Sequence, residues 1–261
     1  MRFMSLLSAI STVAQSAKPA NYRVRLANSE ADIRAAQFLR FVVFNLELRE
    51  GLEIAYETCL DADRFDSVCD HLLVENPATG EVVGTYRLQT GPSAARNHGY
   101  YSEQEFGFGP YEPLRPHVIE LGRACIKEEH RNFTVLNLLW KGIAQYAASH
   151  DAHYLIGCSS FTSQDPALGA AAYQQLQDNL VEERLRTVPT PAFHCPLEIV
   201  SNETPKIPRL LGAYLAVGAK ICGPPALDRD FKTIDFLTLM DLRQLSPRAM
   251  QRFFGISALG N

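Results

Sequence analysis

Hydrophobic and polar residues alternate along several short stretches of this chain, and a period of two predicts β-strands. Residues 22–27 alternate well enough for a first strand, and residues 72–75 and 81–90 are predicted to be two more strands. The turn sequence NPATG joins the latter two, so we expect them to form a hairpin. We expect residues 152–159, AHYLIGCS, to be a strand buried at the centre of a sheet, and residues 231–242 to be a last strand.

Apolar residues with helical spacing occupy stretches between these strands. Ser29 and Asp32 form a capping-box pattern that opens the first helix. Its apolar stripe consists of Ile33, Ala36, Leu39, Val43 and Leu46. Two more helices are expected: residues 165–186, which begin with an N-cap Asp followed by Pro, and residues 208–218, which end at a glycine.

Two long segments have the composition of loops. Residues 91–116 are rich in Gly, Pro, Tyr and Ser, and we expect a short helix near Glu103 within them. The Pro-rich residues 188–208 predict a loop or an edge segment. Strands and helices thus alternate irregularly, with one hairpin early and a strand–helix–strand unit in the middle. This order predicts one mixed α/β domain and not a doubly wound dinucleotide-binding fold.

Residues 117–147, HVIELGRACIKEEHRNFTVLNLLWKGIAQYA, have the clearest chemical content. They predict a strand, a polar turn at 127–134 and a long amphipathic helix. Free N–H groups and the positive end of the helix dipole favour a phosphate at such a turn, and Arg131 adds a charge. An ordinary helix start on an α/β crossover explains the same spacing. No Gly-rich loop of the Walker or Rossmann type decides between the two.

Glu120 lies inside the apolar strand of this segment, where a carboxylate is costly unless it is paired or functional. Burial would raise the pKa of Glu120 and make it a usable general base for an ammonium substrate. A structural ion pair between Glu120 and Arg123 is the alternative. Strict alternation puts these two residues on opposite faces, whereas a bulge at Gly122 would bring them to one side. A base beside a phosphate-binding turn suits acyl transfer from a thioester to an amine.

Two more arginines stand at positions that favour burial. Arg40 interrupts the apolar side of the first helix, and Arg87 lies in the strand VVGTYRLQT. Between them lies an acidic, irregular segment at 59–70 that contains Asp61, Asp63, Asp66 and Asp70, and the first three of these offer partners. A partly buried Arg/Asp network is one interpretation of this set, and a pocket for a zwitterionic amine is the other.

The composition narrows the function classes. The 261 residues are 46% hydrophobic and 21% charged, as in an ordinary globular protein, and the net charge of −4 gives no support for nucleic-acid binding. Six scattered cysteines without a CxxC pair argue against a zinc knuckle or a disulfide framework, and they fit a reducing cytosol. The histidines lack HExxH or HxxxH spacing, so we expect no metal.

A covalent mechanism has little support in the sequence. Cys158 ends the central strand and could act as a nucleophile with His130 or His153 as base, but a small buried side chain is the favoured interpretation. There is no GxSxG elbow, and no His is followed five residues later by Asp. We therefore expect no covalent acyl-enzyme.

The N-terminal residues 1–18, MRFMSLLSAISTVAQSAK, have apolar positions separated by small and polar ones. Serine and threonine residues interrupt the apolar core that a secretory signal needs. An amphipathic helix that touches a membrane surface fits the spacing, and a helical lead-in that packs on the domain or frays fits it equally well. No apolar run of the chain is long enough to span a bilayer.

Four motifs, in order, resemble the ornithine lipid N-acyltransferase branch of the GNAT superfamily, whose members are often called hemolysin-like. They are DADRFDSVCDHLLV at 61–74, GTYRLQT at 84–90, ELGRACI at 120–126 and YLAVGAKICGPPALDRDFKTIDFLTLMDL at 214–242. The resemblance spans residues 22–245, and the relatives include N-acyl amino acid synthases and, more distantly, acyl-homoserine-lactone synthases. It implies a GNAT-like α/β (α+β) fold, with a mixed, mostly antiparallel sheet that has a central splay and is flanked by helices.

The resemblance also implies the substrates. The donor would be a long-chain acyl group on the phosphopantetheine of acyl carrier protein, lying in the splay, with no permanently bound cofactor. The donor-binding residues would be Arg131, Phe133, Thr134, Val135 and Leu136. The turn KEEHRNFT lacks the Gly-rich signature of GNAT enzymes that use coenzyme A, which favours a carrier protein over acyl-coenzyme A. The basic residues Lys127, Arg131 and Lys141 are candidates for contact with that acidic protein.

The acceptor would be the α-amine of an amino acid, with ornithine favoured. Homoserine-lactone synthases have an Arg on the first helix, acidic residues after it, an Arg on a central strand and a Glu-x-x-Arg strand. By resemblance, the acceptor-binding residues here would be Arg40, Asp63, Asp66, Arg87 and Arg123. Glu120 would be the base, directly or through water.

We therefore expect a cytosolic N-acyltransferase with a lead-in at 1–20 and an acyltransferase domain at 21–261. Contact with the inner face of the cytoplasmic membrane is expected if the lead-in is amphipathic. Another amine acceptor would make the protein an N-acyl amino acid or homoserine-lactone-type synthase. A non-catalytic module that binds an acyl chain or acyl carrier protein is the alternative from a different class.

Overall fold

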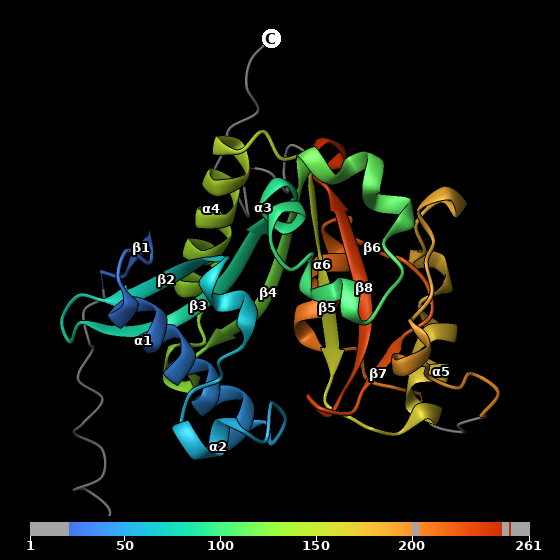
Figure 1. Ribbon diagram of the computed structural model, residues 1–261, viewed down its shortest axis with the longest axis horizontal. Coiled ribbons are helices and arrows are strands. Elements are labelled where there is room, and N and C mark those ends of the chain that lie inside the picture. The colour runs from blue at the N-terminus through green and yellow to red at the C-terminus, as the bar shows by residue number, and fades with distance from the viewer. Residues whose placement is uncertain (1–20, 200–203, 247–250, 252–261) are drawn as a thin grey trace, which may run out of the picture.

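The computed structural model describes residues 21–199, 204–246 and 251. Its centre is a sheet of eight strands among these residues, in the order β1-β2-β3-β4-β5-β8-β6, with β7 also paired to β8 (Figure 1). The strands are β1 (Arg23–Leu26), β2 (Asp70–Asn76), β3 (Glu81–Thr90), β4 (Val118–Ile126), β5 (Tyr154–Phe161), β6 (Lys220–Ile221), β7 (Ala226–Asp228) and β8 (Thr233–Asp241). The amphipathic segment expected at 1–18 lies outside the described residues.

Helices flank the sheet (Figure 1). The α-helices are α1 (Glu30–Phe41), α2 (Ala55–Thr58), α3 (Gly91–Arg96), α4 (Phe133–Ser149), α5 (Pro166–Gln175) and α6 (Arg209–Ala216). A π-helical turn, η1 (Val42–Glu47), extends α1. The 3-10 helices are η2 (Arg64–Ser67), η3 (Tyr101–Gln104), η4 (Gly109–His117), η5 (Glu128–His130), η6 (Gln177–Asn179), η7 (Glu183–Leu185), η8 (Pro191–Phe193) and η9 (Leu242–Gln244). Within the described part of the chain, no helix combines the length and apolar character needed to cross a membrane.

The sheet opens between its two central strands. Neighbouring strands in the described residues are antiparallel except β4 and β5, which run parallel and pair only at 118–120 and 154–156. Beyond Glu120 the two strands diverge (Figure 1). Gly157 permits the last close approach, because a Cβ there would lie 2.1 Å from the carbonyl oxygen of Leu121. The expectation of a mixed, mostly antiparallel sheet with a central splay is confirmed.

A bulge in β4 changes which side chains face the splay. The register between β3 and β4 shifts by one residue between Thr85 and Arg87. Arg123 lies opposite this shift and has a left-handed backbone, with φ of 51°. A residue with a Cβ adopts this conformation only where its surroundings enforce it. The bulge considered at Gly122 is therefore centred one residue further along the strand.

The first helix begins where the capping pattern predicts. The Ser29 side chain accepts a hydrogen bond from the amide of Asp32 at 3.2 Å. The predicted apolar stripe is confirmed at Leu39 and Val43, which are buried, but it is wrong at Leu46, which is 54% exposed. The reason is the π-helical turn η1, whose wider hydrogen-bond spacing rotates later side chains off the stripe.

Helix α4 supplies one side of the main hydrophobic core. The side chain of Asn132 caps the helix by accepting a hydrogen bond from the amide of Val135 at 3.1 Å. Leu139 and Ile143 are buried against apolar side chains of β2 and β3. Each such side chain stabilises the fold by about 1.5–3 kcal/mol, so α4 is anchored firmly beside the splay.

The helix expected at 165–186 is wrong beyond Gln175, where α5 ends. After it, the amide of Val181 donates to the carbonyl of Ile221 at 2.9 Å, and the segment runs beside β6. These tertiary hydrogen bonds satisfy backbone groups that a longer helix would satisfy internally, so they override helical propensity. The short strands β6 and β7 were not expected, because two or three residues carry no detectable period.

Candidate active site

A cavity of about 580 Å³ occupies the splay between β4 and β5. Residues 121–126 of β4 and 155–160 of β5 form its walls. One part of the lining is apolar and includes Leu139, Trp140, Tyr214 and Met240. The remainder carries charged groups, among them Glu120. A hollow of this volume, with apolar walls and a few polar groups, is the usual form of a small-molecule site.

Glu120 lies at the point where the two strands part, and it is only 5% exposed. Its Oε1 accepts hydrogen bonds from the amide and the hydroxyl of Ser102, at 2.8 and 2.6 Å. Its Oε2 accepts one from the amide of Tyr101 at 2.7 Å. Burial raises the pKa of Glu120 above its usual 4.5, although the bonds from Ser102 and Tyr101 oppose the shift. The carboxylate is therefore held rigidly and is more basic than one in water.

Glu120 and Arg123 do not form the ion pair that the sequence left open. Because of the bulge, both residues line the cavity, but they do not pair with each other. Arg123 is instead bound by Asp61 and Asp63, with N–O distances of 3.2 and 3.1 Å. The structural ion pair considered for Glu120 is absent from the described contacts, and the carboxylate is left to face the cavity.

The arginines and aspartates singled out in the sequence do meet. They form the Arg/Asp network, which consists of Arg40, Arg87, Arg123, Asp61, Asp63 and Asp66, whereas Asp70 accepts a hydrogen bond from Tyr146 instead. Arg40 contacts Asp61 and Asp66 at 2.8 and 2.7 Å. Arg87 contacts Asp63 and Asp66 at 2.6 and 3.0 Å. Three cations thus face three anions, so the network is electrically balanced.

The charge balance determines the protonation of the network. Burial alone would raise the pKa of Asp66, but Arg40 and Arg87 outweigh it and hold this pKa well below its usual value. The pKa of Asp63 is also lowered, since Arg87 and Arg123 outweigh burial. Arg87 and Arg123 line the cavities, whereas Arg40 and Asp66 lie behind them. The network therefore holds in place Arg87 and Arg123, the two arginines that line the cavities.

The residues expected to hold the donor are only partly together. Arg131 and Leu136 line the cavity, but Val135 is buried in the core and Phe133 is 74% exposed. The amides of Val135 and Leu136 already donate to Asn132, to Oδ1 at 3.1 Å and to the carbonyl at 3.2 Å. The amides of Phe133 and Thr134 are the ones left at the helix start for an anion.

The basic residues expected to meet a carrier protein differ in their pairing. Lys127 binds Glu81 at 2.5 Å, and Arg131 is paired with Glu47. Lys141 is exposed on α4. Two of the three candidate charges are thus partly neutralised by neighbouring glutamates, which weakens the attraction that they can exert.

Several groups at the cavity were missed in the sequence. Ser102 and Tyr101 belong to η3, and nothing in their local pattern indicates that they hold Glu120. Four buried carboxylates were also missed: Glu50, Glu105, Asp228 and Asp235. Asp235 had a usable signal, because it interrupts the apolar strand TIDFLTLMD in the way that Glu120 interrupts VIELGRACI.

Cys158 behaves as a buried thiol and not as a nucleophile. Its Sγ lies 3.4 Å from the Ser102 hydroxyl and 3.6 Å from Glu105 Oε2, and its described partners include no histidine. Burial and the nearby Glu105 raise the pKa of the Cys158 thiol well above its usual value. A thiol that resists ionisation is a poor nucleophile.

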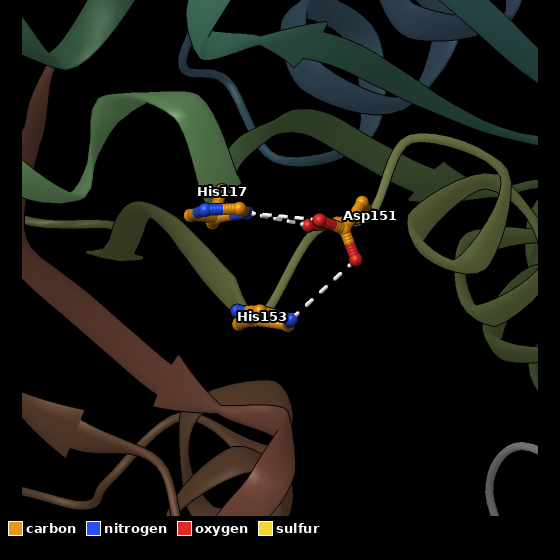
Figure 2. Close-up of side chains that lie close together, drawn as sticks. All are labelled: His117, Asp151 and His153. Atoms are coloured by element: carbon orange, nitrogen blue, oxygen red, sulfur yellow. Dashed lines mark hydrogen bonds and ion pairs between the residues drawn. The ribbon is translucent and has the colours of Figure 1, made fainter.

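A group of metal-ligating residue types lies on the surface. His117 and His153 stack with ring centroids 4.6 Å apart, and both rings point toward Asp151 (Figure 2). Their nitrogens lie 3.4 and 3.6 Å from the Asp151 carboxylate, which is 81% exposed. This geometry fits a solvated ion-pair group. The expectation of no metal stays a prediction.

A mixed sheet that opens between two parallel strands, with a buried carboxylate at the opening, defines the class: this is a GNAT-type acyltransferase. Residues 39–141 match the model of the acetyltransferase (GNAT) domain family. The fold resembles that of the AHL synthase LasI, with a TM-score of 0.53 at 12% identity over 93% of this chain and 99% of that one. It also resembles the CoA-dependent acyl-homoserine lactone synthase BjaI, with a TM-score of 0.50 at 12% identity over 91% and 92%.

Relatives with similar sequences define a narrower family than the fold does. An L-ornithine N(alpha)-acyltransferase of Brucella abortus is 35% identical over 90% of this chain and 89% of its own length. One of Rhizobium meliloti is 33% identical over 92% and 86%, and one of Agrobacterium fabrum is 34% identical over 88% and 84%. The chain belongs to the L-ornithine N(alpha)-acyltransferase family. It is therefore an acyltransferase, as the resemblance implied, and not a non-catalytic binding module.

Proposed function

We propose that this enzyme transfers a long-chain 3-hydroxyacyl group from acyl carrier protein to the α-amine of ornithine, which yields a lyso-ornithine lipid. The names of its relatives support the acceptor. The observation that carries the proposal is the position of Glu120, a buried carboxylate with raised pKa that lines a cavity with apolar walls at the point where β4 and β5 part. An amine and an acyl thioester can meet there with one base within reach.

The chemistry needs a single proton acceptor. The amine nitrogen attacks the thioester carbonyl, so that a C–N bond forms and the C–S bond breaks. The proton lost by the amine passes to Glu120, directly or through water, and the departing thiolate is protonated in turn. Oε2 is the better acceptor, because it receives one hydrogen bond from the protein while Oε1 receives two.

The cavity lining supports a lipidic donor. Side chains of α4 and α6, such as Trp140 and Tyr214, form an apolar wall against which an acyl chain gains about 0.8 kcal/mol per buried methylene group. The start of α4, with the amides of Phe133 and Thr134 and the nearby Arg131, suits the phosphate of a phosphopantetheine arm. The absence of a Gly-rich turn favours a carrier protein as the bearer of that arm.

The test is a direct assay. The purified protein is incubated with acyl carrier protein charged with a 3-hydroxyacyl chain, or with the matching acyl-coenzyme A, and with a panel of amino acids. Mass spectrometry of the lipidic products should show N-acylated ornithine, formed faster from the carrier protein. Acylation of a different amino acid would instead support an N-acyl amino acid synthase, and a preference for acyl-coenzyme A would overturn the proposed donor.

A further inference from the structure

One side of the site carries more buried negative charge than positive charge, since Arg123 is the basic residue beside it and already pairs with Asp61 and Asp63. The acidic subsite consists of Glu50, Glu105, Asp228 and Asp235, each of which is at most 6% exposed. In the described residues, none of the four forms an ion pair with Lys, Arg or His. The three buried arginines are already matched by the aspartates of the Arg/Asp network. The subsite is therefore short of a cation.

These four side chains converge from distant parts of the sequence. Glu105 follows η3, Asp228 ends β7 and Asp235 lies in β8. One carboxylate oxygen from each of these three residues lies within 4.8 Å of the other two. Asp228 and Asp235 line the main cavity together with Glu50, and Asp228 and Glu105 line a second cavity of about 310 Å³. The group is thus built into the wall of the site.

The protein leaves hydrogen-bonding capacity open in this group. Asp228 Oδ1 accepts from the amides of Asp230 and Phe231 at 2.9 and 2.8 Å, and Asp235 Oδ2 accepts from Thr233 at 3.0 Å. The side chains of Glu105 and Asp235 interact with each other, but in the described structure Oε1 of Glu105 and Oδ1 of Asp235 receive no hydrogen bond from any other group, although their residues are 1% and 3% exposed. Unpaired buried oxygens of this kind are costly without a ligand.

The subsite also lies close to the proposed base. Glu120 Oε1 is 2.6 Å from the Ser102 hydroxyl, which is 3.4 Å from Cys158 Sγ, which in turn is 3.6 Å from Glu105 Oε2. Three consecutive contacts therefore join the base to the acidic subsite. Glu120, Asp228 and Asp235 also line the same cavity, so a diamino acid with its α-amine at Glu120 would have its other amine in the space that these carboxylates border.

We propose that Glu105, Asp228 and Asp235, with Glu50 beside them, bind the terminal ammonium group of the acceptor and so select a diamino acid. This inference rests on the proposed function. An alkylammonium group has three N–H donors, which matches three converging carboxylates, and each charge-assisted bond is stronger than a neutral one. Burial and the neighbouring carboxylates of Asp235 and Asp228 raise the pKa of Glu105 well above its usual value, so a proton occupies this group in the free protein and the incoming ammonium replaces it.

The experiment compares two acceptors that differ only at the end of the side chain. Ornithine and 2-aminopentanoate share the α-amine and the carbon chain, and only ornithine has the terminal amine. Wild-type enzyme should show a much larger kcat/KM for ornithine. Asp235→Asn and Glu105→Gln should each lower kcat/KM for ornithine by about 10–100-fold and leave that for 2-aminopentanoate within about twofold. The ratio of the two values is informative even if a variant is less stable.

Asp241→Asn is the matched control, because it makes the same change on β8 at a residue paired with Arg243 and outside the cavity lining. It should leave the ratio unchanged. Equal losses with both acceptors in the subsite variants would overturn the inference and leave the proposed function intact. A wild-type enzyme that acylates no ornithine would instead refute the proposed function itself.

A divalent cation is the competing occupant, since carboxylate oxygens also bind Mg²⁺ and Ca²⁺. Wild-type activity is measured after treatment with a chelator and after addition of Mg²⁺, Ca²⁺ or Mn²⁺. Unchanged activity with ornithine supports the ammonium site. Loss on chelation and recovery with one of these ions would overturn it in favour of a metal site.

Discussion

Two buried charged clusters border the same cavity, and they differ in charge balance. In the Arg/Asp network every carboxylate has a guanidinium partner, and the pKa values of Asp63 and Asp66 are lowered. In the acidic subsite no carboxylate forms an ion pair in the described residues. Burial raises the pKa of Asp235 to about 6, and at Glu50 it outweighs the charge of Arg123, so that the pKa of Glu50 is raised to about 7. Burial acts on both clusters, so the difference comes from the neighbouring charges.

The comparison distinguishes a structural cluster, the Arg/Asp network, from a cluster that can bind a ligand, the acidic subsite. A balanced cluster is electrostatically complete in the free protein, and its task is to hold Arg87 and Arg123 in place. An unbalanced cluster is completed by something that binds, either a proton or a cationic ligand. Perturbed pKa values in a cavity are therefore more informative about substrate binding when no partner in the protein explains them.

The largest expected effect is at Glu120, which is buried like the acidic subsite but is held by hydrogen-bond donors. Glu120→Gln should lower kcat by about 10²–10⁴-fold, because the amide cannot accept the proton. In wild-type enzyme kcat/KM should fall as the pH drops through the raised pKa of Glu120, since only the carboxylate is a base. The pH profile of the variant should lose this acidic limb.

The variant Ser102→Ala tests whether Glu120 acts as a base or only has a structural role. It leaves Glu120 in place but removes the hydroxyl donor at 2.6 Å. This bond lowers the pKa of Glu120, so its loss should move the acidic limb of the pH profile to higher pH. If the acidic limb of the pH profile lies at the same pH in wild type, Ser102→Ala and Glu120→Gln, Glu120 is not the titrating base.

The next largest effect should come from breaking the Arg/Asp network. Arg40→Met removes one of the two arginines that contact each of Asp61 and Asp66, while it preserves most of the buried volume. Three buried carboxylates would then share the two remaining arginines, so one negative charge would be buried without compensation, and the free energy of unfolding should fall by about 3–5 kcal/mol. Urea denaturation at pH 7 measures this loss.

Arg25→Met is the control for this prediction. Arg25 also binds two acids, Asp32 and Glu75, but its side chain is 26% exposed. Water and salt screen such a pair, so the loss should be about 1 kcal/mol or less. A similar cost at Arg25 and Arg40 would mean that burial does not distinguish the network from an ordinary surface ion pair.

The sequence predicts the parts of this site that follow from local patterns. The hairpin, the capped start of α1 and the helix α4 have clear periods, and a carboxylate in the apolar strand identifies Glu120. Arg40 and Arg87 could be linked to the aspartates because opposite charges at buried positions need each other. These inferences use the charge of each residue and the burial that the period of the pattern indicates.

The remainder depends on long-range contacts. The bulge at Arg123 follows from the register between β3 and β4, and a left-handed arginine has no signature in the sequence. Glu105 and Asp235 are 130 positions apart and meet only because η3 and β8 fold against the same cavity. The chain after Gln175 leaves the helix because β6 offers backbone partners. Periodicity carries no information on any of these contacts.

The pH dependence of stability should distinguish the two clusters. The pKa of Glu50 is raised from 4.5 to about 7 in the folded protein, so its contribution to stability is fully present below pH 4.5 and lost as the pH rises through 7. Asp63 and Asp66 act in the opposite direction. Because their pKa values are lowered in the folded protein, their contribution to stability is present above pH 3.8 and is lost as the pH falls below it. Glu50→Gln should remove only the first effect.

Urea denaturation of wild type and Glu50→Gln at pH 5 and pH 8 checks this. The difference between the two proteins should change by up to about 3 kcal/mol across this range, with the variant gaining at pH 8. Asp241→Asn serves again as control, because its carboxylate is paired with Arg243. A pH-independent difference would mean that Glu50 titrates as it does in the unfolded chain.

The smallest expected effect tests what a single hydrogen bond does in the unbalanced cluster. The hydroxyl of Thr162 donates to Glu50 Oε2 at 2.7 Å, and this bond lowers the pKa of Glu50 against the effect of burial. Thr162→Val should reduce the free energy of unfolding by about 2 kcal/mol at pH 8, where the bond is charge-assisted, and by about 1 kcal/mol at pH 5. In the Glu50→Gln background this pH dependence should vanish, because no charge remains to be stabilised. If it persists there, the hydroxyl acts on another member of the acidic subsite, and the charge of Glu50 is balanced in some other way.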